Sequence, residues 1–264
     1  MRRTTPILLV VFVTSCAESH RIASPAAYPQ FIETIDGTAV AFDMIPVPGD
    51  PVLGVEPFWI GRTEVTWDAY DVFVYGFDGP AEAARTEADA VTRPSKPYIS
   101  MDRGFGHAGY AVISVSNRGA MAFCVWLSHK TGRRYRLPTE AQWRFACSLG
   151  QVPSAEIGRY AWYRGNADFK THAVGTREAD AGGLHDMYGN ASEWCTGADG
   201  RPVTLGGSYR DDMEGLGCAA RVRPSAAWNQ SDPQIPRSVW WLADAGFVGF
   251  RVVCEPDVTA GEQQ

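Results

Sequence analysis

The sequence lacks features that mark several common classes of protein. After Ser15 it contains no apolar segment of the length that a membrane-spanning helix requires. It contains no long run of Lys and Arg and its net charge is -6, so we expect no nucleic-acid partner, because phosphate binding requires clustered positive charge. The five histidines include no pair with metal-ligand spacing on an expected helix. These absences argue against a transmembrane domain after Ser15, nucleic-acid binding and a histidine-ligated iron oxygenase.

The composition is that of a folded domain. Of the 264 residues, 45% are hydrophobic and nine are tryptophan, which is enough apolar material for a substantial core. The length by itself allows one large domain or two small ones.

The start of the chain resembles a bacterial export signal. Two arginines precede an apolar stretch over Ile7–Val13, and the sequence VTSC that ends at Cys16 is similar to a lipobox. We therefore predict a signal peptide over 1–15, a lipid on Cys16 and a polar tether over 16–30. The protein would then be a membrane-anchored lipoprotein that faces the periplasm or the cell surface. An ordinary signal peptide or a misassigned start codon is the alternative.

The first half of the chain after the tether carries signals for three helices and one strand. Alternating apolar residues predict a strand over Ala39–Val47. Helical spacing after Ser116 predicts a helix that Gly132 ends. Thr139 begins TEAQ, a capping box that predicts the start of a second helix. A further helix is expected to follow the sequence EVT and to run through Phe73.

After Gly150 the sequence predicts short elements and many loops. Gly, Asn and Asp become frequent, and short apolar pairs alternate with turn signals. Together with the earlier helices, this pattern predicts an α+β domain with a loop-rich second half.

Three strings resemble one family. RLPTEAQW at 136–143, GGSY at 206–209 and CAAR at 218–221 are similar to sequences of the formylglycine-generating enzymes, or sulfatase-modifying factors, and the resemblance covers about residues 38–254. It implies a complex α+β fold related to C-type lectins. We therefore predict a single domain over 31–256 and a disordered tail over 257–264.

The same resemblance argues against the chemistry for which the family is known. Its enzymes oxidise a client cysteine to formylglycine, with copper(I) held by two cysteines shortly after GGS(Y/W). Here Arg210–Leu216 contains no cysteine, and carboxylates are hard ligands that cannot replace thiolates on copper(I). We therefore expect neither copper binding nor formylglycine formation. Because the family is one of oxidoreductases, whether this chain is an enzyme stays open.

The resemblance also implies two disulfides. Cys124 would pair with Cys254, and Cys147 with Cys218, in an exported protein in which disulfides are allowed. Cys254 lies two residues further along than the corresponding family cysteine. Cys195 would remain, and next to a tryptophan it is expected to be a buried apolar residue rather than a nucleophile.

The sequence DMYGNASEW resembles the family's calcium loop. The implied ligands are Asp186, Glu193 and the backbone carbonyls of Gly189 and Ala191. Carboxylate and carbonyl oxygens on a tightly turning backbone are suitable ligands for calcium. The alternative is a turn in which the acidic side chains cap neighbouring backbone groups.

A binding groove is expected at the GGSY turn. In the family, the serine at the position of Ser208 lines the active groove. Here the sequence around Ser208 lacks the GxSxG motif of a hydrolase nucleophile. Aromatic walls with a few polar groups suit the capture of a ligand, although they also suit a loop-rich core. The candidate groove residues are Ser208, Tyr209, Arg210, Asp211 and Asp212, with Trp228, Trp240 and Trp241 as further aromatic candidates.

These observations predict an exported member of the family that binds a peptide, a glycan or a partner protein, and that has lost formylglycine formation. Two enzymatic alternatives stay open. One is an oxidase that uses Cys195 and Cys218 as a displaced copper pair, for which Cys147 would have to be unpaired. The other is a different chemistry built on the carboxylates of Asp211 and Asp212.

Overall fold

The computed structural model describes residues 28–79 and 87–256. The predicted signal peptide, the lipid on Cys16 and the tail over 257–264 lie outside the described residues, as does most of the tether. Among the described residues, no helix has the length and apolar character needed to cross a bilayer.

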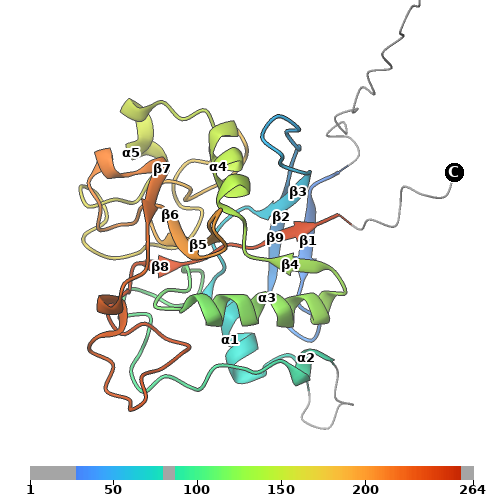
Figure 1. The fold of residues 1–264 in the computed structure, drawn as a ribbon, viewed down its shortest axis with the longest axis vertical. Coiled ribbons are helices and arrows are strands. Elements are labelled where there is room, and N and C mark those ends of the chain that lie inside the picture. The colour runs from blue at the N-terminus through green and yellow to red at the C-terminus, as the bar shows by residue number, and fades with distance from the viewer. Residues whose placement is uncertain (1–27, 80–86, 257–264) are drawn as a thin grey trace, which may run out of the picture.

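Two sheets form the framework of the domain (Figure 1). The first has the strand order β1-β2-β3-β9-β4, and all of its neighbouring strands are antiparallel. The second has the order β7-β6-β5-β8, in which only β5 and β8 are parallel. The strands are β1 (Phe31–Thr34), β2 (Ala41–Val47), β3 (Phe58–Gly61), β4 (Arg134–Arg136), β5 (Ser192–Thr196), β6 (Pro202–Gly206), β7 (Gly217–Val222), β8 (Val248–Gly249) and β9 (Val253–Glu255).

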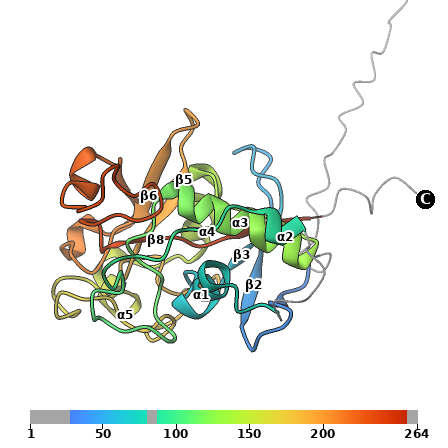
Figure 2. The same ribbon diagram turned by 90° about the horizontal axis from the view of Figure 1, so that it is seen from below.

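The longer helices lie in the first two thirds of the chain. In the view of Figure 1, α3 crosses below the two sheets and α4 stands above it, while Figure 2 shows α1 and α2 from below. The helices are α1 (Trp67–Tyr75), α2 (Glu87–Ala90), α3 (Asn117–Thr131), α4 (Glu140–Leu149) and α5 (Ile157–Tyr160), with short 3-10 turns η2 (Ser154–Glu156), η3 (Met213–Gly215) and η4 (Ala226–Asn229).

The local signals for helix ends are confirmed. The Ser116 side chain accepts a hydrogen bond from the Gly119 amide at the start of α3, and Gly132 ends that helix with a left-handed φ of 71°. At the start of α4, Thr139 and Gln142 form the predicted reciprocal capping box. After Gly150 the described elements are all short, as expected, so the predicted α+β class is confirmed.

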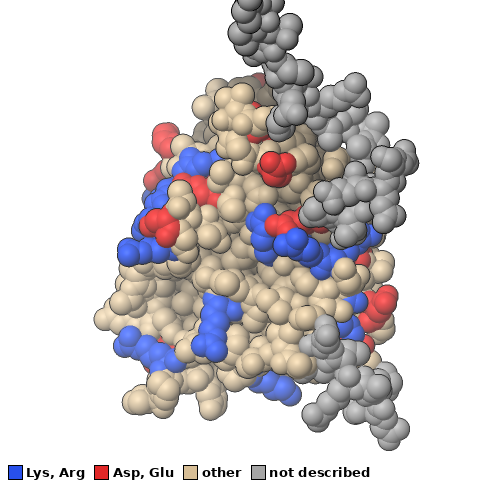
Figure 3. Space-filling view, turned by 45° about the vertical axis from the view of Figure 1, so that its right-hand side comes forward, with Lys and Arg blue, Asp and Glu red and all other residues tan. Residues whose placement is uncertain are grey.

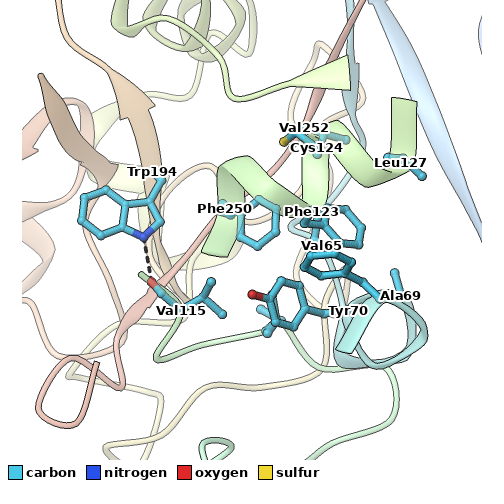
Figure 4. Packing of buried hydrophobic residues seen from close by; sticks show 14 of the residues in the cluster. Val65, Ala69, Tyr70, Val115, Phe123, Cys124, Leu127, Trp194, Phe250 and Val252 are labelled. Carbon is cyan, nitrogen blue, oxygen red and sulfur yellow. Dashed lines mark hydrogen bonds between the residues drawn. The ribbon is translucent and has the colours of Figure 1, made fainter. Parts of the chain in front are cut away.

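The buried side chains form two clusters. One lies between α1, α3 and the first sheet and contains tilted and edge-on rings of Tyr70, Phe123 and Phe250 (Figure 4). In the same cluster the indole of Trp194 donates a hydrogen bond of 2.8 Å to the Val115 carbonyl, which ties the second sheet to the start of α3. The other cluster lies under α4, around Trp143.

The structure contains one of the two implied disulfides. Cys147 of α4 and Cys218 of β7 are bonded, which fastens the helix to the edge strand of the second sheet. The implied bridge between Cys124 and Cys254 is wrong, since Cys124 is a buried thiol outside any disulfide. The offset along the chain explains this, because two residues of extended strand span about 7 Å, more than the Cβ separation of about 4 Å in a disulfide. Figure 4 shows Cys124 in the same part of the core as Val252.

Candidate functional site

One face of the second sheet forms the floor of an open cleft. Trp194 of β5 lies opposite Thr204 of β6, and Thr204 lies opposite Val222 of β7, so these residues share a face. Ser192, two residues before Trp194, belongs to the same face. Ser192, Thr204 and Val222 line a cleft of about 500 Å³, while the opposite face of the sheet packs toward α4.

The GGSY turn forms one wall of the cleft. Gly206 and Gly207 have φ values of 90° and 78°, a region that favours glycine, and a Cβ at Gly207 would lie 2.6 Å from Leu216 Cδ2. After this turn, Asp211 Oδ2 accepts hydrogen bonds from the Ser208 amide (2.8 Å) and from Ser208 Oγ (2.9 Å). Ser208 is buried and its hydroxyl is bonded to a carboxylate rather than to a histidine, so the site lacks an activated serine nucleophile.

Arginines shape the outer part of the cleft. Arg164 Nε donates a hydrogen bond of 2.9 Å to the Arg210 carbonyl, and Arg164 Nη1 lies 2.9 Å from Asp212 Oδ2. The guanidinium of Arg210 lies over the Phe247 ring, 4.9 Å from its centroid. Arg164 and Arg210 also line a second hollow of about 540 Å³, which is continued by Tyr209 and by the exposed ring of Phe169. The cleft is therefore elongated, with Arg210 where its two parts join.

The structure brings four of the five candidate groove residues to the cleft. Ser208, Arg210 and Asp211 line the first part, Tyr209 and Arg210 line the second, and Asp212 pairs with Arg164 at the margin. The expectation that Trp241 lines the groove is wrong, since it is 1% exposed and packs against rings of α1. Phe247 and Phe169, which the sequence did not indicate, supply aromatic surface instead.

None of the described residues that line the two parts of the cleft is a cysteine. Cys218 is bonded to Cys147, which contradicts the hypothesis of a displaced copper pair made of Cys195 and Cys218. Cys195 is fully buried in the cluster under α4, and burial raises the pKa of its thiol well above the usual value. It is therefore a buried apolar residue, as expected.

A second cluster of polar side chains is buried between the two sheets. Arg251 is 0% exposed and binds Glu193 through two contacts of 2.6 Å, from Nε and from Nη2. The remaining guanidinium donors reach the carbonyls of Gly61 and His185, each at 2.9 Å. The indole of Trp143 donates a further hydrogen bond of 2.7 Å to Glu193. Glu193, one of the implied calcium ligands, is thus already paired with a buried cation.

Two other carboxylates in this cluster are less well satisfied. Glu64 accepts hydrogen bonds through Oε1 from Asn190 and Ala191, and Asp186 accepts one through Oδ2 from Gly175. Their other oxygens, Glu64 Oε2 and Asp186 Oδ1, are buried and have no partner among the described residues. Burial raises the pKa of both groups, and for Glu64 the neighbouring carboxylates raise it further.

The donor chemistry of Glu64 and Asp186 fits a hard cation such as calcium, because both unsatisfied atoms are carboxylate oxygens. Within residues 28–79 and 87–256, no group of three or more His, Cys, Asp or Glu side chains is arranged to hold a metal ion, so backbone carbonyls would have to complete the set. The sequence indicates Asp186 but not Glu64, whose EVT motif predicts only the start of a helix.

A loop-rich α+β domain with two small sheets and a cleft at a GGSY turn is the architecture that the sequence resemblance implied. Residues 37–256 match the sulfatase-modifying factor enzyme 1-like domain, and the chain belongs to this family. The predicted C-type-lectin-like fold of the formylglycine-generating enzymes is thereby confirmed.

The relatives are distant. The chain is 26% identical over 228 residues to "Chaperone protein LppX" of Paenibacillus barcinonensis, a match that covers 67% of this chain and 79% of that protein. It is 29% identical over 150 residues to the formylglycine-generating enzyme of Mycobacterium tuberculosis, covering 50% of this chain and 45% of the enzyme. The chain therefore spans less than half of the length of that enzyme.

Solved structures share the fold. Treponema denticola variable protein 1 has a TM-score of 0.61 at 21% identity, with 86% of this chain and 99% of that chain covered. PvdO from Pseudomonas aeruginosa has a TM-score of 0.53 at 21% identity, with 86% and 92% covered. At this level of identity the likeness concerns the fold only.

Proposed function

We propose that this protein is an exported, lipid-anchored member of its family that binds a protein or peptide in the cleft at the GGSY turn and does not form formylglycine. The observation that carries the proposal is the chemistry of the cleft, which has arginine and aromatic side chains but no thiol among its described lining residues. Copper(I) requires soft ligands, so a cleft without thiolates is unsuited to it, whereas aromatic and charged groups suit ligand capture.

The carboxylates of the cleft also favour binding over catalysis. Asp211 caps the turn at Ser208, and Asp212 forms an ion pair with Arg164. Both acidic groups therefore hold the wall of the cleft in place. The name of the Paenibacillus relative, a chaperone, is in line with a role in protein binding.

A pair of variants on β7 tests whether the cleft is the binding site. Ala220 lines the cleft, whereas its neighbour Ala219 is exposed and is not among the described residues that line it. Peptides selected from a random dodecapeptide library on the wild-type protein are expected to bind the Ala219→Trp variant as tightly and to lose binding to Ala220→Trp. Fluorescence anisotropy with the labelled peptides measures this. Equal binding to both variants, or no enrichment on the wild type, would contradict the proposal.

Loss of the family's oxidase activity is tested directly. The protein is incubated with copper(I), a reductant, oxygen and a client peptide that contains cysteine, and the peptide is analysed by mass spectrometry. We expect the cysteine to stay unchanged, while a formylglycine product would refute this part of the proposal.

Lipid anchoring depends on Cys16. Two or more acyl chains hold a protein stably on a membrane, so the native protein should sediment with membranes, and Cys16→Ser should release it into the soluble fraction. Metabolic labelling with a palmitate analogue provides an independent readout. A Cys16→Ser variant that still sediments and still carries label would contradict lipidation at this residue.

Calcium is proposed as a structural ion near Asp186 and Glu64. A divalent cation would neutralise two buried carboxylates that otherwise repel each other, so calcium should raise the melting temperature and EDTA should lower it. Asp186→Asn and Glu64→Gln should each weaken the response. Magnesium is the matched control, because it requires a stricter geometry than calcium. No rise for the wild type would count against the site.

A further inference from the structure

The cleft carries positive charge in a protein that is acidic overall. Among the described residues that line its first part, three are positively charged, Arg164, Arg210 and Arg221, and one, Asp211, is negatively charged. The chain as a whole has a net charge of -6. On the face shown in Figure 3, basic and acidic side chains lie interspersed on a mostly uncharged surface. The charge of the cleft is therefore a local feature of the site.

Only one of these arginines is available to a ligand. Arg164 is paired with Asp212, and Arg221 is paired with Glu140 of α4 at 2.9 Å. Within residues 28–79 and 87–256, no carboxylate forms an ion pair with Arg210. This leaves Arg210 as the cation of the cleft whose charge the described residues do not balance.

Arg210 is also held in place. Its amide donates to Ser208 Oγ at 3.3 Å, its carbonyl accepts from Arg164, and its guanidinium lies over the Phe247 ring, 4.9 Å from the centroid. A guanidinium that lies over an aromatic ring can still donate hydrogen bonds from its N–H groups to a carboxylate. A side chain that is already positioned loses less entropy when it binds a ligand.

Aromatic surface lies on both sides of Arg210. Phe247 belongs to the first part of the cleft, and Phe169, 69% exposed, and Tyr209 belong to the second. Phe105 packs edge-on against Tyr209 at 5.5 Å and supports that side. A central cation between two aromatic surfaces in an elongated cleft suits an extended chain with an acidic group between two apolar groups.

We propose that the cleft recognises an extended peptide segment in which an Asp or Glu is flanked by aromatic or apolar residues, with Arg210 binding the carboxylate. This inference rests on the proposed function, since it names the class of ligand that the same cleft takes. The acidic group is on the ligand and the basic group on the protein, and binding involves no covalent step.

The test uses two capped peptides that differ in one group, acetyl-Gly-Phe-Glu-Phe-Gly-amide and the same peptide with Gln in place of Glu. Binding is measured by isothermal titration calorimetry at low salt. The acidic peptide should bind at least about tenfold more tightly, because a hydrogen bond between charged groups is stronger than one between neutral groups. Arg210→Gln should reduce this ratio to about one, and added salt should reduce it in the wild type.

Arg223→Gln is the matched control, since Arg223 is paired with Asp199 and is not among the described residues that line the cleft. It should keep the preference for the acidic peptide, and circular dichroism should show that both variants are folded. Equal binding of the two peptides would overturn the recognition of acid while leaving peptide binding intact. A preference that survives Arg210→Gln would overturn the role of Arg210. Binding of glucuronate but of neither peptide, or binding of no probe, would overturn the peptide assignment.

Discussion

Replacing Arg251 by methionine removes the cation at the centre of the buried cluster. The guanidinium is 0% exposed and makes two contacts of 2.6 Å with Glu193 and further hydrogen bonds to three backbone carbonyls. The variant leaves the Glu193 carboxylate buried beside Glu64 and Asp186 with no positive charge to balance it. Breaking one partner of a buried ion pair typically costs about 3–5 kcal/mol, a large fraction of the stability of a domain.

Urea unfolding followed by tryptophan fluorescence measures this loss. The double variant Glu193→Gln with Arg251→Met should be more stable than Arg251→Met alone, because it no longer buries an unpaired charge. Arg223→Met is the control for losing an exposed pair, which costs no more than about 1 kcal/mol. If Arg251→Met costs no more than this control, the buried pair of Arg251 and Glu193 does not stabilise the domain in the way that these contacts predict.

Three further predictions concern single features of the fold. Cys147→Ser opens a disulfide with a sequence separation of 71 residues, and chain entropy predicts a loss of about 4 kcal/mol; a melting temperature within a degree or two of the wild type would contradict this. Gly207→Ala should cost at least about 1 kcal/mol, from its left-handed φ of 78° and the contact with Leu216, and unchanged urea stability would refute the strain. His107 lies between Asp71 and Asp102; burial alone lowers its pKa, but the hydrogen bonds to both carboxylates outweigh burial and raise the pKa above its usual value. Its stabilisation is fully present below the pKa of the unfolded chain, about 6.5, and is lost as the pH rises through the raised pKa of the folded state, so the melting temperatures of wild type and His107→Ala should converge with rising pH and should not differ by a constant amount.

Features that depend on a few neighbouring residues were predictable from the sequence. The capping box at Thr139, the glycine that ends α3 at Gly132 and the strand over Ala41–Val47 follow from local backbone chemistry. The absence of cysteine from Arg210–Leu216, directly after the GGSY turn, is likewise a fact of the sequence, and it bears on the chemistry of the site without any coordinates. The implied pair of Cys147 and Cys218 came from the family resemblance rather than from local signals.

Contacts between distant segments depended on the tertiary structure. Nothing local to Glu64, Asp186 or Arg251 indicates that they meet, because they come from separate parts of the chain and become neighbours only when the two sheets pack. The same is true of Phe247, which follows Arg210 by many residues and yet lies beneath its guanidinium.

The sequence by itself therefore determined the class of the domain, its helix ends and the loss of thiolate at the cleft, since each depends on residue type or on near neighbours. Only the tertiary structure decided which cysteines are bonded, which arginine of the cleft is available to a ligand and which carboxylates are buried together. These properties depend on distances of a few ångströms between residues that are far apart along the chain, and the packing of the whole domain sets such distances.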